Sequence, residues 1–299
     1  WLGSRALSTQ KPDAVINVGN KLQHGGSSPL VPRHVKFVDM RIDSASMGNV
    51  ITTDVPLVAD VAYGMEDLMS AIQDIMTPSI KKKVLERAEK VHAASAKMRQ
   101  FRPVMTKNPD WNQKPLLSDR LTYEIAQFAD DNAIIVDEAG SVGGMHLFDF
   151  NPLGGREYFR RFGGHLGGGV GRAAGVKLAR PKQQVICLVG DGAFIFGPTA
   201  LWNMARLGLG VIVVVYNNHA YGGPHNRLVR AVPGGRMVQT GHFFCDYLGS
   251  PDMNMAYMAK AFGVDGEQVE SPDELQAALQ RARRASPDAR LLELWGDTT

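Results

Sequence analysis

Two short apolar segments, Val185–Val189 and Val211–Tyr216, constrain the fold of this chain more than any other feature of its sequence. Each is a continuous apolar run, which is typical of a strand buried on both faces of a sheet. Residues Thr199–Leu207 between them have the spacing of a helix. Because a strand, a helix and a second strand join in a right-handed crossover, the two strands should be parallel neighbours. The sequence therefore predicts an α/β fold built on a parallel sheet.

Polar residues follow both of these strands. Gly190-Asp191-Gly192 follows the first strand, and after a further 24 residues Asn217-Asn218 follows the second. Since parallel strands end at the same edge of a sheet, Asp191 and Asn218 should emerge there side by side, where open α/β sheets bind ligands. Carboxylate and amide oxygens suit Mg²⁺, which shares its coordination shell with phosphate groups. The helix expected after Phe196 would offer free N–H groups to the same anion.

A glycine-rich segment, Gly163–Gly171, stands just before a helix expected at Arg172–Leu178. Six of its nine residues are glycine, and this density indicates backbone packed so closely that no Cβ fits. A third candidate region, Val136–Ser141, lies at the end of another apolar strand. It offers Gly140 and Ser141 as further phosphate donors.

The rest of the chain divides into a short α/β region, a helical link and the region that contains these motifs. In residues 1–78 strands alternate with a helix, which predicts part of a Rossmann-like domain. Residues 79–115 contain a polar surface helix and then a proline-rich linker. Residues 116–299 form a second α/β domain. Because the chain starts at Trp1 and enters its first domain abruptly, we expect its natural start to be missing or processed.

Composition and charge exclude several classes of protein. The chain is 44% hydrophobic and 21% charged, as globular proteins are, and no apolar run approaches the ~18 residues of a membrane span. A net charge of +3, with scattered basic residues, gives no indication of a nucleic-acid partner. Cys187 and Cys245 are too few for a disulfide framework, and Cys187 should be a buried, inert thiol. We therefore expect a reducing, cytoplasmic compartment.

Taken together, these motifs resemble the diphosphate-binding domain of thiamine-diphosphate enzymes. The resemblance rests on Gly190-Asp191-Gly192, on the 24-residue spacing to Asn217-Asn218, and on Phe162–Gly169 and Lys177–Pro181 before them. More narrowly, the chain is similar to the acetolactate synthase, benzoylformate decarboxylase and pyruvate oxidase group. The resemblance implies α/β parallel-sheet sandwiches: a partial transhydrogenase-like middle domain and a thiamine-diphosphate-binding C-terminal domain.

The same resemblance implies a function and a set of site residues. The function is that of a thiamine-diphosphate- and Mg²⁺-dependent lyase or carboligase acting on a 2-oxo acid or 2-hydroxyacyl compound, with decarboxylation through an enamine intermediate and, in acetolactate synthase-like enzymes, ligation. The metal ligands would be Asp191, Asn218 and the backbone carbonyl of Ala220. Leu166 falls where the family places a bulky apolar residue under the bent cofactor. The cofactor contacts would be Gly140, Ser141, Gly164, Leu166, Gly190, Gly192, Ala193, Asn218, Tyr221 and Gly222.

One part of the family's catalytic machinery has no counterpart in this sequence. In the family, an activating glutamate lies in an N-terminal pyrimidine-binding domain, and the cofactor lies between two subunits. Glu138 belongs to the diphosphate side and is not a substitute. We therefore expect a missing N-terminal segment or another chain to supply that domain, in a homodimer or homotetramer. Gly171-Arg172 also departs from the family, which usually has a Leu-Pro pair there.

Simpler interpretations stand beside several of these residues. On the simpler interpretation, Asp191 and Asn218 are ordinary turn residues at the ends of strands, and Leu166 is an ordinary residue of the hydrophobic core. His165 precedes Leu166 and is a second candidate catalytic residue, because histidine exchanges protons near neutral pH. Histidines and tyrosines in predicted loops are also common at surfaces without any role, and this applies to His165, His219, Tyr221 and His225.

Alternative functions also stay open. The glycine-rich segment could hold a dinucleotide, although a Rossmann fingerprint follows the first strand and needs an acidic residue ~20 residues on. The chain could be a non-catalytic or regulatory subunit that keeps the cofactor fold, or a nucleotide-binding protein that uses Mg²⁺-phosphate chemistry. The sequence does not identify the substrate and gives no positive sign of a flavin.

Overall fold

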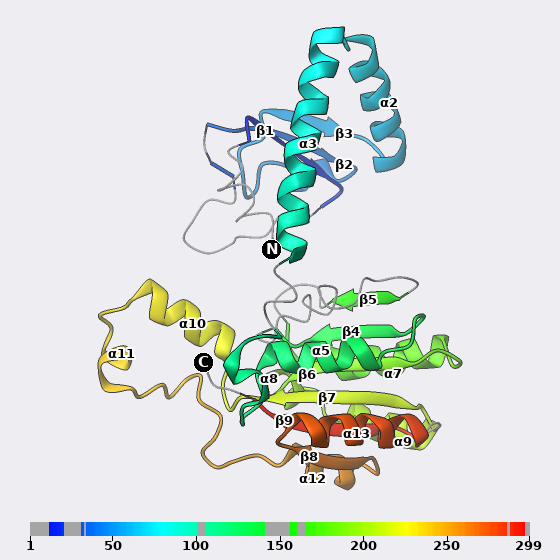
Figure 1. The fold of residues 1–299 in the computed structure, drawn as a ribbon, viewed down its shortest axis with the longest axis vertical. Coiled ribbons are helices and arrows are strands. Elements are labelled where there is room, and N and C mark those ends of the chain that lie inside the picture. The colour runs from blue at the N-terminus through cyan, green and yellow to red at the C-terminus, as the bar shows by residue number, and fades with distance from the viewer. Residues whose placement is uncertain are drawn as a thin grey trace. The chain divides into compact units, whose positions relative to one another are not determined.

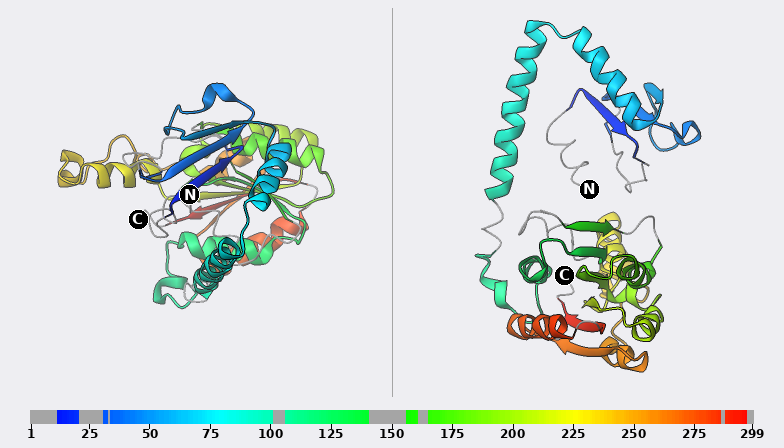
Figure 2. Two further views of the ribbon diagram at one scale, coloured as in Figure 1. Left: turned by 90° about the horizontal axis from the view of Figure 1, so that it is seen from above. Right: turned by 90° about the vertical axis from the view of Figure 1, so that its right-hand side faces the viewer.

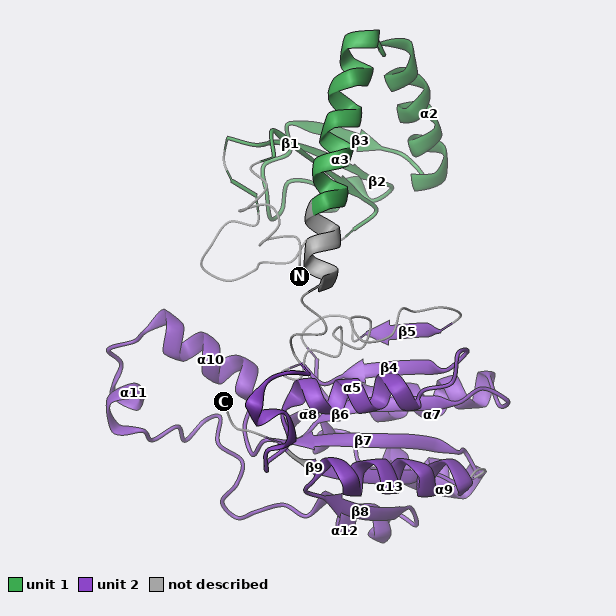
Figure 3. Cartoon of the chain, viewed as in Figure 1, with its two compact units in different colours: residues 1–93 green, residues 94–299 purple. Residues whose placement is uncertain are grey.

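In the computed structural model, the chain forms two compact units, residues 1–93 and 94–299 (Figure 3). The described residues are 12–20, 31–32, 34–100, 106–140, 156–160, 165–285 and 288–296, with backbone alone for 94–100 and 295. Each unit has a parallel sheet of its own. In the described part of the chain, no helix combines the length and the apolar character needed to cross a bilayer.

Unit 1 is a small parallel sheet followed by two helices (Figure 1). Its described elements are β1 (Ala14–Val18), β2 (Lys36–Arg41), the 3-10 turn η1 (Ser44–Ser46), β3 (Val55–Val58), α2 (Val61–Asp74) and most of α3 (Pro78–Gln100), whose last turns belong to unit 2. The strands lie in the order β1-β2-β3, and both pairs are parallel. Buried Val31, Val35 and Phe37 form a small core on which Val15 and Ile51 pack.

Unit 2 contains the motifs and a larger sheet. Its described elements are η2 (Pro109–Asn112), α5 (Ser118–Phe128), β4 (Ile134–Glu138), β5 (Glu157–Arg160), α7 (Gly168–Ala179), β6 (Val185–Gly190), α8 (Asp191–Phe194), α9 (Ala200–Leu207), β7 (Val211–Asn217), α10 (Gly222–Ala231), α11 (Arg236–Thr240), α12 (Met255–Ala261), β8 (Asp265–Val269), α13 (Pro272–Arg284) and β9 (Arg290–Trp295). Among the described residues, six strands form this sheet in the order β5-β4-β6-β7-β9-β8.

All strand pairs of the unit 2 sheet are parallel, so the predicted α/β parallel-sheet fold is confirmed. In particular, β6 and β7 are neighbours, with Gly190 in register with Tyr216. The crossover argument predicted this pairing from the two apolar segments. Both strands therefore end at one edge of the sheet, which is the edge that carries Asp191 and Asn218.

Helices cover both faces of this sheet (Figure 2, right). Helices α5 and α13 pack on one face, where side chains such as Ile186 and Leu188 point. Helices α7, α9 and α12 pack on the other, against Val185, Cys187 and Val189. Because successive residues of a strand point to opposite faces, a strand covered on both sides must be apolar throughout. This explains why β6 and β7 are continuous apolar runs.

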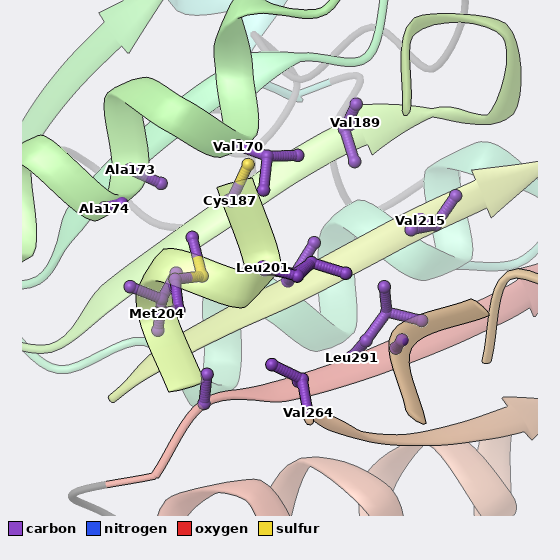
Figure 4. Packing of buried hydrophobic residues seen from close by; sticks show 14 of the residues in the cluster. Val170, Ala173, Ala174, Cys187, Val189, Leu201, Met204, Val215, Val264 and Leu291 are labelled. Carbon is purple, nitrogen blue, oxygen red and sulfur yellow. The ribbon is translucent and has the colours of Figure 1, made fainter. Parts of the chain in front are cut away.

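The second of these cores explains the state of one cysteine (Figure 4). Val170 and Ala173 of α7 and Leu201 and Met204 of α9 belong to the cluster that encloses Cys187. Cys187 is fully buried, and burial raises the pKa of its thiol well above the ordinary value. The predicted burial of this thiol is thereby confirmed, and a buried thiol with a raised pKa is a weak nucleophile.

Candidate functional site

Asp191 lies at the carboxyl end of β6, and its side chain is almost completely buried, with 2% exposed. Its Oδ1 accepts a hydrogen bond from the N–H of Gly192 at 2.7 Å, and its Oδ2 accepts one from the N–H of Ala220 at 3.1 Å. Burial raises the pKa of Asp191 to about 6, although these backbone hydrogen bonds and His219 act in the opposite direction. No lysine or arginine is among the described groups that shift this pKa, so the buried carboxylate favours a cation at this point.

Two buried asparagines, Asn217 and Asn218, stand where strand β7 ends. Asn217 donates from Nδ2 to Oε1 of Glu293 at 2.9 Å, and its Oδ1 accepts from the N–H of His219 at 3.1 Å. Glu293 is fully buried and also accepts from the first two N–H groups of α12, each at 3.0 Å. Asn217 is thus anchored in the core. Asn218 is the next residue after Asn217. It is also buried, at the same edge of the sheet as Asp191.

The residues that follow Asn218 contact Asp191 and its neighbour Gly192. Ala220 supplies one of the N–H groups described above, and Tyr221 stands at the start of α10. A Cβ added to Gly192 would lie 2.2 Å from Cε1 of Tyr221, so the ring packs directly on that glycine. Burial and then the charge of Asp191 raise the pKa of Tyr221. The fold therefore brings Asp191, Gly192, Ala220 and Tyr221 into one site.

The glycine-rich segment packs against the protein itself. Helix α7 begins at Gly168, so the expectation that the segment would precede a helix starting at Arg172 was wrong. The carboxylate of Glu138 accepts hydrogen bonds from the N–H groups of Gly168 and Gly169 at 3.3 and 2.5 Å. These bonds cap the N-terminus of α7, so the helix starts four residues before the expected Arg172. A Cβ on Gly169 would lie 2.6 Å from Oε2 of Glu138. Gly167 has a φ of 93° and contacts Phe196, so only glycine suits that position.

Other predicted site residues lie around this edge of the sheet. Gly190 has open space where a Cβ would stand, with no atom within 4 Å among the described residues. Ala193 is buried in α8 and Gly222 is buried in the first turn of α10. Leu166 is half-buried and packs on the core beneath α7, whereas His165 and Gly140 are exposed. Two predicted residues lie outside the described ones: Ser141 and Gly164.

The predicted helix after Phe196 is present, but its first N–H groups are not free. Helix α9 begins at Ala200. The N–H groups of Ala200, Leu201 and Trp202 donate to the carbonyls three residues before them, at 3.4, 3.0 and 3.2 Å. The expectation that these groups would bind an anion was therefore wrong, because the turn before the helix already satisfies them.

The chemistry of the site fits a hard divalent cation. In the part of the chain that the structure describes, no group of three or more His, Cys, Asp and Glu side chains could hold a metal by itself. An ion beside Asp191 would therefore take one carboxylate together with amide and carbonyl oxygens. Its remaining ligands would come from outside the chain, as when Mg²⁺ is shared with a diphosphate.

Two side-chain contacts near the candidate site were not predicted from the sequence, because the partners lie far apart along the chain. Asn217 and Glu293 are 76 residues apart, and His225 and Asp246 are 21 residues apart. His225 was expected in a loop but lies in α10, with its Nδ1 3.0 Å from Oδ2 of Asp246. No local pattern in the sequence marks such pairs. The only available signal was that Glu293 is a charged residue inside an apolar strand, Leu291–Leu294.

Comparison with known proteins gives the family. Residues 138–294, more than half of the chain, match the sequence profile described as "Thiamine pyrophosphate enzyme, C-terminal TPP binding domain". The chain belongs to the thiamine pyrophosphate enzyme family. Thiamine pyrophosphate is the same compound as thiamine diphosphate, so the resemblance to this family seen in the sequence is confirmed.

Individual relatives of this thiamine pyrophosphate enzyme family member are distant. The chain is 23% identical over 280 residues to the "probable acetolactate synthase large subunit" of Methanococcus aeolicus. This alignment covers 90% of this chain and 45% of the relative. It is 31% identical over 128 residues to benzoylformate decarboxylase of Pseudomonas aeruginosa, which covers 43% of this chain and 22% of the relative.

A solved structure supports the fold over nearly the whole chain. The thiamine diphosphate-dependent 4-hydroxybenzoylformate decarboxylase of Rhodococcus jostii RHA1 superposes with a TM-score of 0.67 at 20% identity. The superposition covers 99% of this chain and 51% of that structure. The chain therefore spans about half the length of the proteins it resembles.

Proposed function

We propose that this chain is the diphosphate- and Mg²⁺-binding part of a thiamine pyrophosphate-dependent lyase or carboligase that acts on a 2-oxo acid. The observation that carries this proposal is the buried carboxylate of Asp191, 3.1 Å from the N–H of Ala220, where β6 and β7 end. Membership of the family supplies the cofactor. The relatives named acetolactate synthase and benzoylformate decarboxylase support the substrate class.

The residues at this edge of the sheet fit the diphosphate end of the cofactor. Asp191, the side-chain oxygen of Asn218 and the carbonyl of Ala220 would hold Mg²⁺, and two diphosphate oxygens would complete much of its shell. The space beside Gly190 would receive the anion. The residues proposed for the other cofactor contacts are Gly140, Ser141, Gly164, Leu166, Gly192, Ala193, Tyr221 and Gly222.

The bound cofactor would supply a nucleophilic carbon for the substrate carbonyl and an electron sink for the bond that breaks. The chain's own residues would position and enclose it. Leu166, packed on the core beneath α7, would support the cofactor from one side. His165 is exposed and could exchange a proton with the substrate. Asp191, ionised, would compensate the charge of the metal.

Glu138 supports the view that the rest of the catalyst comes from elsewhere. Its carboxylate accepts hydrogen bonds from the N–H groups of Gly168 and Gly169 and caps helix α7. It is therefore engaged in structure and does not serve as the activating acid. We propose that a pyrimidine-binding domain, from another segment or another chain of a homodimer or homotetramer, supplies that acid. Residues 1–78 would be part of a middle domain, 79–115 a link, and 116–299 the diphosphate domain.

Calorimetric titration of the full chain with thiamine pyrophosphate, with and without Mg²⁺, tests the cofactor site. We expect binding that requires Mg²⁺, because one protein carboxylate cannot attract a diphosphate without the ion. ATP and NAD are the comparison ligands, since both carry linked phosphates (a triphosphate and a diphosphate) but lack a thiazolium. Tighter binding of either nucleotide would contradict the proposal and favour a nucleotide-binding protein.

Release of CO₂ tests the activity. The complete assembly, including a pyrimidine-binding partner, is incubated with a panel of 2-oxo acids and Mg²⁺. Release of CO₂ from at least one of them is expected. An assembly that binds the cofactor but releases no CO₂ from any substrate would instead be a non-catalytic or regulatory subunit.

A further inference from the structure

The loop between β7 and α10, residues 218–221, is held by a distant stretch of chain, residues 246–252, which we call the clamp segment. Ala220 and Tyr247 form an isolated antiparallel bridge. The N–H of Tyr221 donates to the carbonyl of Asp246 at 2.7 Å, and the N–H of Leu248 donates to the carbonyl of His219 at 2.6 Å. The clamp segment therefore pairs with the loop like a short strand.

This pairing determines which way the backbone of Ala220 points. The two hydrogen bonds are made by its neighbours His219 and Tyr221, so Ala220 occupies a non-hydrogen-bonded position of an antiparallel pair. In such a position, the N–H and the C=O of the residue both point away from the partner strand. The N–H of Ala220 accordingly reaches Oδ2 of Asp191 at 3.1 Å. The clamp segment turns the backbone of Ala220 towards the candidate metal site.

His219 provides the bend that this arrangement needs. Its φ is 54°, in the left-handed region that side chains other than glycine seldom adopt. Its ring is mostly buried, and Nδ1 lies 2.9 Å from Oδ1 of Asp252. Its N–H is held from the core side by Asn217, which Glu293 anchors. The strained residue is therefore fixed on both sides, by the core and by the clamp segment.

We propose that Asp252 is a positioning residue that acts through His219 to hold the Ala220 backbone beside Asp191 for a divalent cation. This inference rests on the proposed function, because it assigns a role toward the Mg²⁺-diphosphate site. The ion pair of Asp252 is with the ring of His219, so its effect on the site passes through that residue. It holds the left-handed turn closed, so that a metal meets a preformed set of oxygens and need not order the loop.

The test compares Asp252→Asn with Asp265→Asn in the full chain. Both aspartates are partly exposed, at 57% and 64% of the side chain, and both lie within 3 Å of a basic side chain, at 2.9 and 2.7 Å. Asp265 is at the start of β8, at the opposite end of the sheet. We expect Asp252→Asn to raise the Mg²⁺ concentration needed for thiamine pyrophosphate binding on the order of 10-fold. Without ligands, it should also speed hydrogen exchange at the N–H groups of Tyr221 and Leu248. Asp265→Asn should do neither.

A double-mutant cycle with His219→Gly separates positioning from a general charge effect. Glycine adopts the left-handed conformation without strain, so the bend remains while the contact with Asp252 is lost. If Asp252 acts through His219, Asp252→Asn should have no further effect on Mg²⁺ dependence in the His219→Gly chain. A full additional effect there would overturn the inference, because the carboxylate would then act by charge alone.

The remaining outcomes distinguish the inference from the proposed function. Unchanged Mg²⁺ dependence in Asp252→Asn, with normal binding by the wild-type chain, would overturn the inference alone. Equal losses in Asp252→Asn and Asp265→Asn would also overturn it. Absence of Mg²⁺-dependent binding in the wild-type chain would overturn the proposed function, and the inference with it.

Discussion

Two buried aspartates, one in each unit, have opposite surroundings. Asp39 in β2 is 1% exposed, and the guanidinium of Arg41 binds both of its oxygens, at 2.9 and 2.8 Å. Asn17 also donates to it, at 2.8 Å. Asp191 in unit 2 is 2% exposed, and its hydrogen bonds come from the backbone N–H groups of Gly192 and Ala220.

The difference shows which buried charge the protein compensates by itself. Arg41 neutralises Asp39 and in turn reaches Oγ of Ser46 at 2.8 Å, so the unit 1 network is closed. Asp191 has backbone hydrogen-bond donors and the imidazole of His219 in place of a guanidinium, and burial outweighs these and raises its pKa to about 6. A charge that is buried at a binding edge without a cation is costly in the absence of a ligand.

The largest effect should come from breaking the closed network. Arg41→Met would leave Asp39 buried with only neutral partners, and removal of one member of a buried ion pair costs about 3 kcal/mol or more. Urea unfolding monitored by hydrogen exchange in β1 and β2 measures this loss. Lys36→Met is the control, because its ion pair with Asp54 is exposed, with 74% of the Lys36 side chain accessible. Equal losses in both variants would contradict the assignment of Asp39 and Arg41 as a closed pair.

The next effect concerns binding and not stability. In Asp191→Ala, the affinity for thiamine pyrophosphate in Mg²⁺ should fall by about 100-fold or more, because the one carboxylate ligand of the ion is lost. Calorimetric titration measures the affinity, and urea unfolding should show that the metal-free variant is at least as stable as the wild type. Asp131→Asn serves as the control, since Asp131 is fully exposed and 3.8 Å from Arg156. Unchanged affinity in Asp191→Ala would refute the proposed metal site.

The stability of the metal-free protein should depend on pH through the titration of the Asp191 carboxylate. The pKa of Asp191 is about 6 in the folded protein and near 3.8 in the unfolded chain, so the folded state holds this proton more tightly. Its contribution to stability is therefore present below pH 3.8 and is lost as the pH rises towards 6. The full pKa difference corresponds to roughly 3 kcal/mol, of which about 2 kcal/mol should be lost between pH 4 and pH 7. Urea unfolding between pH 4 and 7 measures it, and in Asp191→Asn this component should vanish. The same pH profile in the variant and the wild type would contradict the assignment.

The smallest predicted effect concerns the packing of Tyr221. In Gly192→Ala, the new Cβ would lie 2.2 Å from Cε1 of Tyr221, so the ring must leave its place against residue 192. We expect thiamine pyrophosphate to bind about 10-fold more weakly, ~1.4 kcal/mol. Gly175→Ala is the control, because a Cβ at Gly175 in α7 has no atom of the described residues within 4 Å. Wild-type affinity in Gly192→Ala would show that the position of Tyr221 does not matter for the site.

The sequence by itself determined the centre of the unit 2 sheet. Strands β6 and β7 are covered by helices on both faces, so Val185–Val189 and Val211–Tyr216 are continuous apolar runs and the pattern is visible in the sequence. The connection through α9 then requires them to be parallel neighbours. Strands β5 and β8 were not predicted from the sequence. They are the two edge strands of the sheet, and their sequences, Glu157–Arg160 and Asp265–Val269, are partly exposed and polar.

Only the tertiary structure decided how the site is held. The motif Asn217-Asn218 indicated a ligand edge, but not that Asn217 is bound to Glu293 or that residues 246–252 pair with the loop after Asn218. The tertiary structure likewise decided that Gly167 packs on Phe196 and Gly169 on Glu138. Local patterns report burial and turns, which depend on neighbours in the sequence. Contacts between distant segments depend on how the whole sheet is assembled, and no short stretch of sequence contains that information.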